Sequence, residues 1–133
     1  MTEVLLDTSV LIEFLRAKGK KTAFEQLLAR GWRPAISFIT LAELWAGKSV
    51  WESKEKTAVL EKLLSGMRVI LPAAEVPKLS GKLKAEYGIS LLDAFIAAEA
   101  LQKKLPLATL NQKDFGKIKG LKLLQASSLK PAA

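Results

Sequence analysis

The stretch Val4–Ile12, VLLDTSVLI, decides the fold, because one pattern of secondary structure gives way to another across a single acidic residue. Val4–Leu6 is a short apolar run, which predicts a buried strand. From Val10 to Leu15 apolar residues recur at helical spacing, and Thr8 or Ser9 is a candidate cap for that helix. A buried strand that leads straight into a helix is typical of α/β folds.

The rest of the chain repeats this alternation. Further strands are predicted at Pro34–Phe38, Arg68–Leu71, Leu107–Leu110 and Leu121–Leu124. Helices are predicted at Thr22–Arg30, at Leu41–Ala46 after a cap at Thr40, at Glu52–Leu64, at Ala73–Tyr87 and at Leu91–Lys103. This order predicts a three-layer α/β/α fold, in which helices cover both faces of a parallel sheet of four or five strands. No repeat, linker or low-complexity segment interrupts the chain, so we expect one domain over residues 1–133.

The composition excludes several kinds of catalytic site. The 133 residues include no cysteine and no histidine, which excludes disulfides, thiol catalysis, Ser-His-Asp triads and metal sites built on thiolate or imidazole. An enzyme with this composition must work with carboxylates, lysine, hydroxyl groups or a bound ion. Carboxylates without nitrogen or sulfur ligands favour hard cations such as Mg²⁺ or Mn²⁺.

The charge and the apolar runs bear on partners and location. A net charge of +8 favours a polyanionic partner, nucleic acid ahead of membrane, although the same charge also serves solubility. The N-terminal residues MTEVLLDTS lack a basic start and their apolar run is broken by Asp7, unlike a signal peptide. No apolar run approaches the ~20 residues of a membrane span. We therefore expect a cytoplasmic protein without membrane contact.

Four acidic residues fall where an α/β fold would place functional groups. Asp7 directly follows the first strand, and ligands of open α/β sheets bind beyond the carboxyl ends of the strands. Glu43 lies in the helix TLAELWAG, Asp93 in the apolar helix SLLDAFIAA, and Asp114 in ATLNQKDF after a late strand. The Asp93 carboxylate, surrounded by apolar residues, costs free energy unless a metal, a basic partner or backbone donors compensate it.

Each acid also has an ordinary explanation. Asp7 suits a helix N-cap, Glu43 a solvated position, Asp93 a first helical turn and Asp114 a simple turn. Together, however, four carboxylates at such positions can converge on one crevice, where their mutual repulsion is resolved by a cation. A hard divalent ion held there can deprotonate water and stabilise the charge of an in-line phosphoryl displacement.

The same residues lie in stretches that resemble PIN domains, and within them the VapC-type toxins of bacterial and archaeal toxin–antitoxin pairs. The matching stretches are LLDTSVLI at Leu5–Ile12, ITLAELWAG at Ile39–Gly47, LLDAFIAAEA at Leu91–Ala100 and LATLNQKDF at Leu107–Phe115. Their order, spacing and chain length match the family, so the resemblance covers essentially the whole chain. It implies that the catalytic, metal-binding acids are Asp7, Glu43, Asp93 and Asp114, with polar support from Ser9, Thr40, Thr109 and Asn111.

The resemblance further implies an Mg²⁺- or Mn²⁺-dependent endoribonuclease that cleaves RNA, forms a homodimer and has a separately encoded antitoxin. One alternative is a non-catalytic PIN-like module that binds RNA or protein, which the intact set of acids disfavours. Another is a different α/β protein, such as a phospho-receiver domain. That class needs an acidic pair beside the first strand, and Asp7-Thr8-Ser9 lacks it.

Basic residues gather near the acids in the sequence. Residues 16–33 carry Arg16, Lys18, Lys20, Lys21, Arg30 and Arg33 against one acid, and residues 102–122 carry Lys103, Lys104, Lys113, Lys117, Lys119 and Lys122 against one acid. Such bases can hold a phosphodiester backbone beside an acidic pocket, although many lysines on helix faces are simply solvated. Among the tryptophans, Trp51 is a candidate dimer contact, but tryptophan is as often a core residue.

Overall fold

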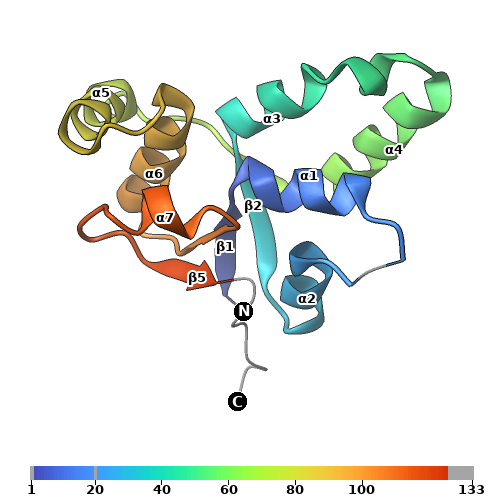
Figure 1. Ribbon diagram of the computed structural model, residues 1–133, viewed down its shortest axis with the longest axis horizontal. Helices are drawn as coiled ribbons and strands as arrows, with labels where there is room; N and C mark the ends of the chain where they lie inside the picture. Colours follow the sequence, from blue (N-terminus) through green and yellow to red (C-terminus); the bar gives the residue numbers. More distant parts are fainter. Residues whose placement is uncertain (1, 20, 126–133) are drawn as a thin grey trace.

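The computed structural model describes residues 2–19 and 21–125, and its centre is a five-stranded parallel sheet with the order β3-β2-β1-β4-β5 (Figure 1). The strands are β1 (Glu3–Leu6), β2 (Arg33–Ser37), β3 (Arg68–Ile70), β4 (Leu107–Thr109) and β5 (Leu123–Gln125). Leu5 of the central strand pairs with Ala35 on one side and with Leu107 on the other. The predicted parallel sheet of four or five strands is therefore confirmed.

Helices connect the strands. They are α1 (Thr8–Arg16), α2 (Ala23–Ala29), α3 (Phe38–Trp45), the 3-10 helix η1 (Lys48–Trp51), α4 (Lys54–Ser65), α5 (Val76–Tyr87), α6 (Leu91–Lys103) and α7 (Gln112–Phe115). Within the described ranges, none of these helices is long and apolar enough to cross a bilayer. Lys20, one of the predicted basic residues, lies outside the described residues.

Successive residues of β1 belong to two different hydrophobic cores, because side chains alternate between the faces of a strand. Leu5 packs with residues of α5 and α6, whereas Val4 and Leu6 pack with residues of α1, α2, α3 and α4. Figure 1 shows α5 and α6 on one side of the sheet and α1 and α2 on the other. The predicted three-layer α/β/α architecture is thus confirmed.

The start of α3 differs from the sequence prediction. The strand was expected to run to Phe38 and the helix to follow a cap at Thr40, but the helix begins at Phe38 and Ser37 is its N-cap. The Ser37 hydroxyl accepts a hydrogen bond from the backbone N–H of Ile39 at 3.1 Å, which satisfies a free donor of the first turn. Thr40 therefore lies within the helix, where it is fully buried.

The turn between α5 and α6 sets the position of Asp93. Helix α5 begins at Val76, later than the predicted Ala73, and ends at Gly88, whose φ of 68° favours a residue without a Cβ. Two residues later Ser90 caps α6 by accepting a hydrogen bond from the backbone N–H of Asp93 at 3.1 Å. Asp93 is thereby fixed in the first turn of α6.

Candidate active site

Three of the four predicted site acids follow the three central strands of the sheet, and Asp93 lies on α6. Because β2, β1 and β4 are neighbours and parallel, the segments after them start at the same edge. Asp7 follows β1, the helix that carries Glu43 follows β2, and Thr109 ends β4 just before the turn that carries Asp114.

Asp7 is a buried carboxylate held by two hydroxyl groups. It occupies the N-cap position of α1, yet its side chain makes no capping hydrogen bond. Instead its Oδ2 accepts hydrogen bonds from Ser9 Oγ and from Thr109 Oγ1, each at 2.7 Å. Hydrogen bonds to an ionised acceptor are stronger than neutral ones, so this pair fixes the orientation of the carboxylate.

Glu43 is held by a threonine of the first helix. Thr8 Oγ1 lies 2.6 Å from Glu43 Oε1 and 3.0 Å from Thr40 Oγ1. A hydroxyl has one proton, so Thr8 donates to the closer carboxylate and can accept from Thr40. Both threonines are buried and Glu43 is half-buried, which contradicts the ordinary explanation of a freely solvated side chain.

Asp114 is tied to the end of β4 through Asn111. Asn111 is the N-cap of α7, and its side-chain amide donates to Asp114 Oδ2 at 3.2 Å. The backbone N–H of Asn111 in turn donates to Thr109 Oγ1 at 2.9 Å. Lys117 Nζ lies 4.0 Å from Asp114 Oδ1, and this exposed pair contributes little to stability.

Asp93 reveals how the four acids are related electrostatically. Its pKa is raised first by burial and then by the negative charge of Asp7, with further increases from Asp114 and Glu43, while a hydrogen bond with Ser90 lowers it. All three other acids therefore act on Asp93. Among the described residues, however, no three acidic side chains form a ready-made group for a metal ion. The other three carboxylates are therefore close enough to affect the charge of Asp93, but the four are not arranged as a complete metal-coordination shell.

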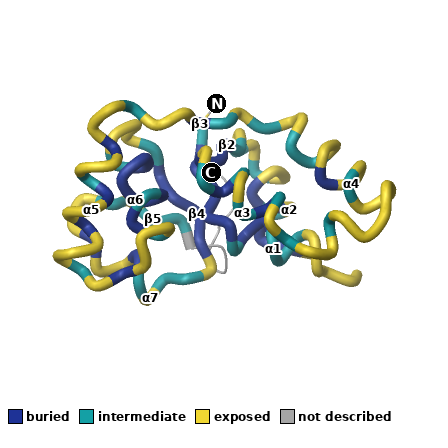
Figure 2. Tube along the Cα trace, turned by 90° about the horizontal axis from the view of Figure 1, so that it is seen from above, coloured by how far each residue is buried: buried dark blue, intermediate teal, exposed yellow. Residues whose placement is uncertain are grey.

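A hollow opens beside Glu43. It has a volume of about 150 Å³ and is lined by Ile12, Leu15, Arg16, Glu43, Leu44, Gly47, Ser49 and Val50. A second hollow of about 370 Å³ shares Leu15, Ser49 and Val50 with it and extends along α4. Figure 2 shows that α4 lies at the edge of the molecule with most of its residues exposed. Because the two hollows share three lining residues, they lie side by side, and together they are called the groove from Glu43 to α4.

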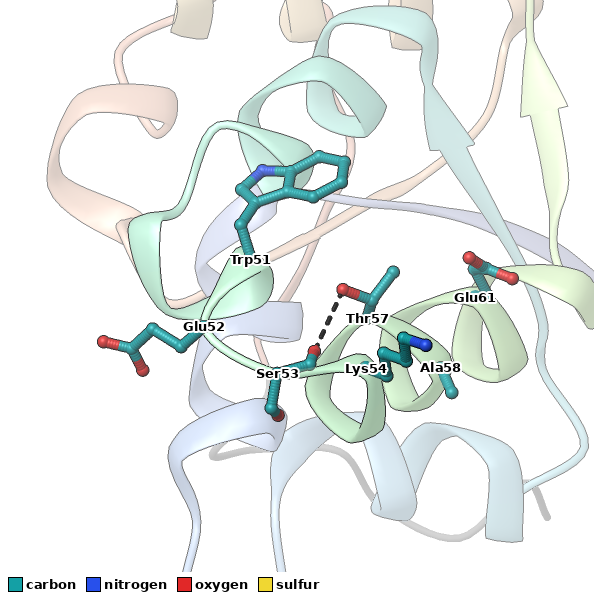
Figure 3. Close-up of a pocket in the computed structure, with 7 residues that line it drawn as sticks. All are labelled: Trp51, Glu52, Ser53, Lys54, Thr57, Ala58 and Glu61. Atoms are coloured by element: carbon teal, nitrogen blue, oxygen red, sulfur yellow. Dashed lines mark hydrogen bonds between the residues drawn. The ribbon is translucent and has the colours of Figure 1, made fainter.

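A separate pocket of about 480 Å³ lies on the junction of η1 and α4, where Trp51 stands over the start of α4 (Figure 3). Trp51 is 64% exposed, and its Nε1 donates to the carbonyl of Trp45 at 2.8 Å. None of the four predicted site acids lines this pocket.

Two further polar residues, Thr8 and Glu99, bond to a site acid or lie on a helix that carries one. Thr8 was considered only as a helix cap, and Glu99 was not singled out. Glu99 is fully buried on α6, where its Oε1 accepts a hydrogen bond from Ser37. The one signal for it was a glutamate inside the apolar run LLDAFIAAEA.

Fold and site together define an α/β protein with an acidic region at the carboxyl edge of its sheet, and the chain matches the PIN domain family over residues 4–121. The chain belongs to this family, so the predicted membership is confirmed. It is 32% identical over 130 residues to Ribonuclease VapC1 of Methanocaldococcus jannaschii, and the alignment covers 92% of this chain and 87% of the relative.

Solved structures of toxin–antitoxin complexes share the fold. One is VapBC2 from Rickettsia felis bound to a DNA fragment from its promoter, with 30% identity, a TM-score of 0.78, and coverage of 93% of this chain and 98% of the other. Another is a toxin–antitoxin complex from Klebsiella pneumoniae, with 30% identity, a TM-score of 0.75, and coverage of 92% and 97%.

Proposed function

We propose that this protein is a metal-dependent endoribonuclease and the toxin of a VapBC-type toxin–antitoxin pair. The similarity to Ribonuclease VapC1 supports the nuclease activity, and the similarity to VapBC complexes supports the antitoxin partner. The observation that carries the proposal is the link that Thr109 makes between two of the acids: its hydroxyl donates to Asp7 Oδ2 and accepts from the backbone N–H of Asn111, whose side chain donates to Asp114. The charges of Asp7, Asp114 and Glu43 also raise the pKa of Asp93, after burial, which is the larger cause. Four acids concentrated at one edge of a PIN domain favour a cation as their natural counter-charge.

In this proposal Asp7, Glu43, Asp93 and Asp114 are the catalytic, metal-binding acids. Their donor chemistry fits Mg²⁺ or Mn²⁺, because all four offer hard carboxylate oxygens and the chain has no histidine or cysteine to favour a softer metal. When bound, such an ion supplies an activated water and charge stabilisation at the phosphate.

The chain's own residues orient these acids. Ser9 and Thr109 both donate to Oδ2 of Asp7, so among the described residues Oδ1 is left without a hydrogen-bond donor. Thr8 plays the same part for Glu43, and Asn111 does so for Asp114. These hydrogen bonds hold the carboxylates in place despite their repulsion, as supporting partners of metal ligands do.

The proposed substrate is RNA, and the proposed location is the cytoplasm. A net charge of +8 attracts a polyphosphate chain. Arg16 lines the same hollow as Glu43, so a cationic residue borders this hollow and could hold a backbone phosphate there.

Two protein partners complete the proposal. The groove from Glu43 to α4 offers apolar side chains to a segment of the antitoxin, whose arginine would occupy the acidic region in place of the cation. A second copy of the chain would cover exposed apolar side chains at the carboxyl edge of the sheet, such as Phe38 and Leu71, which are 50% and 67% exposed.

The test is cleavage of end-labelled RNA by purified protein with Mg²⁺, Mn²⁺ or EDTA. Wild type should cleave with metal and not with EDTA, and Asp93→Asn should lose at least roughly a hundredfold in rate. Glu86→Gln, which changes an exposed carboxylate on α5, is the matched control and should cleave like wild type. RNA binding without cleavage under any metal condition would instead favour the non-catalytic binding module.

A further inference from the structure

Glu99 is a carboxyl group in the core that the proposed reaction does not use. It is 0% exposed on α6, and it belongs to the hydrophobic layer on the α5–α6 side of the fold through its neighbours Ala98 and Ala100. Its Oε1 accepts a hydrogen bond from Ser37. Its Oε2 is buried and has no hydrogen-bond partner among the described residues.

Ser37 lies between β2 and α3, the helix that carries Glu43. It is also 0% exposed, it ends β2, and its hydroxyl caps α3. The bond between Ser37 and Glu99 therefore joins the first turn of α3 to the middle of α6. The first of these helices carries Glu43, and the second carries Asp93.

The surroundings favour the neutral form of Glu99. An ionised carboxylate with one oxygen buried and unpaired would lose its hydration without compensation, whereas a protonated group loses far less. Burial raises the pKa of Glu99, outweighing the lowering effects of the Ser37 hydrogen bond and of the charge of Lys103, one turn along the same helix. Lys103 is exposed, so its charge is largely screened by solvent.

We propose that Glu99 is a positioning residue, which in its neutral form holds α6 against the start of α3 through Ser37 and so sets the spacing between Asp93 and Glu43. An apolar side chain of similar volume would fill the core without an unpaired oxygen, so packing alone does not account for a glutamate here. A directional hydrogen bond, by contrast, fixes how two helices lie together. The consequence for metal binding rests on the proposed function, because it treats Asp93 and Glu43 as ligands.

Two substitutions at Glu99 separate positioning from stability. Glu99→Gln keeps an acceptor for the Ser37 hydroxyl and cannot ionise, whereas Glu99→Met keeps the volume and removes the acceptor. Ser37→Ala removes the partner, and Ser80→Ala is the matched control. Ser80 is 1% exposed, but its hydroxyl donates to Val76 O of its own helix at 2.7 Å and joins no second helix.

For each variant of the full chain, the Mn²⁺ dissociation constant is measured by electron paramagnetic resonance, and the melting temperature is measured without metal. We expect Glu99→Met to melt as high as wild type or higher and yet to bind Mn²⁺ about tenfold more weakly. Glu99→Gln should bind like wild type. The double variant of Ser37→Ala and Glu99→Met should lose no more affinity than one of its parents, because both changes break the same bond.

Equal Mn²⁺ affinity in wild type and Glu99→Met would overturn the inference, and so would a loss in Glu99→Gln as large as that in Glu99→Met. If wild type itself bound no Mn²⁺, the proposed metal site would be wrong. The positioning role of Glu99 would then be tested by NMR on the metal-free protein. The chain has three aspartates, so ¹³C labelling of aspartate gives only three side-chain carboxyl signals to assign. Added microsecond-to-millisecond exchange at Asp93 in Glu99→Met supports positioning, and unchanged exchange overturns it.

Discussion

The hydroxyl of Thr109 donates a hydrogen bond to the carboxylate of Asp7 at 2.7 Å, although the two residues are 102 positions apart in the chain. The same hydroxyl accepts from the backbone N–H of Asn111 at 2.9 Å. One side chain thus links the carboxylate after β1 to the turn that carries Asp114. Thr109 is 1% exposed, so neither bond competes with bulk water.

Replacing Thr109 with valine should weaken both the fold and the site. Valine matches the shape but leaves Asp7 with one hydroxyl donor fewer and the Asn111 N–H without its acceptor, so the free energy of unfolding should fall by about 1–3 kcal/mol. The Mn²⁺ affinity should fall by about tenfold. Urea unfolding and Mn²⁺ titration check these values.

The serine variant of Thr109 keeps the hydroxyl and should restore most of the affinity. Thr57→Val is the matched control, because the Thr57 hydroxyl donates to Val50 O at 2.6 Å and to none of the four acids. If the Thr109→Val and Thr109→Ser variants bound Mn²⁺ equally well, the hydroxyl would have no part in orienting Asp7.

The raised pKa of Asp93 makes the apo protein less stable as the pH increases. The unfolded chain releases this proton near the ordinary pKa of 3.8, whereas the folded protein retains it to higher pH. Asp93 therefore contributes a growing loss of stability from pH 3.8 upward through its pKa in the folded protein. The free energy of unfolding of wild type minus that of Asp93→Asn should fall over this range and then level off.

Urea unfolding at a series of pH values checks this difference. The contribution of Glu99, whose pKa is also raised, is present in both proteins and cancels. A difference that rises with pH would mean that the Asp93 carboxylate is stabilised in the fold rather than destabilised.

The antitoxin and the metal should compete. The acidic region without its ion suits an arginine of the partner, which can pair with carboxylates through two parallel hydrogen bonds. The affinity for the cognate antitoxin should therefore fall as Mn²⁺ is added, and it should change in Asp93→Asn. Calorimetric titrations measure both effects. Identical affinity for wild type and Asp93→Asn, with no effect of metal, would place the antitoxin on another surface.

Leu71→Asp should dissociate the proposed homodimer. Leu71 and Phe38 directly follow the paired residues Ile70 and Ser37 of β3 and β2, so both apolar side chains are exposed at the same end of the sheet. A buried charge at such a contact is costly, and sedimentation velocity should show a monomer. Leu28→Asp, on α2, is the control and should remain dimeric. Dissociation by Trp51→Ala instead would support the earlier candidate contact.

The fold was predictable because the strands are short apolar runs separated by helices, and this alternation leaves few arrangements besides a covered parallel sheet. The location of Asp7 followed from the same pattern, since the apolar run of β1 ends on it. The start of α3 was not predictable, because Ser37 and Thr40 are both residues that commonly cap helices. The choice depends on β2 continuing to Ser37, which pairs with Ile70 of β3.

Contacts between segments far apart in the chain also could not be predicted from the sequence. The sequence offers Thr109 as a polar residue near Asp114, but nothing in its spacing shows that its hydroxyl reaches Asp7. Glu99 was missed for a different reason. Helix α6 is apolar almost all round, so its periodicity does not show which positions face the core.

The most direct test of the central claim is the effect of Mn²⁺ on the melting temperatures of wild type and Asp93→Asn. If the four acids hold a cation, metal should raise the wild-type melting temperature with a dependence on concentration, because a ligand stabilises the state that binds it. Asp93→Asn should melt at least as high as wild type without metal and gain much less on its addition. An equal metal-induced gain in the two proteins would contradict the role proposed for these acids.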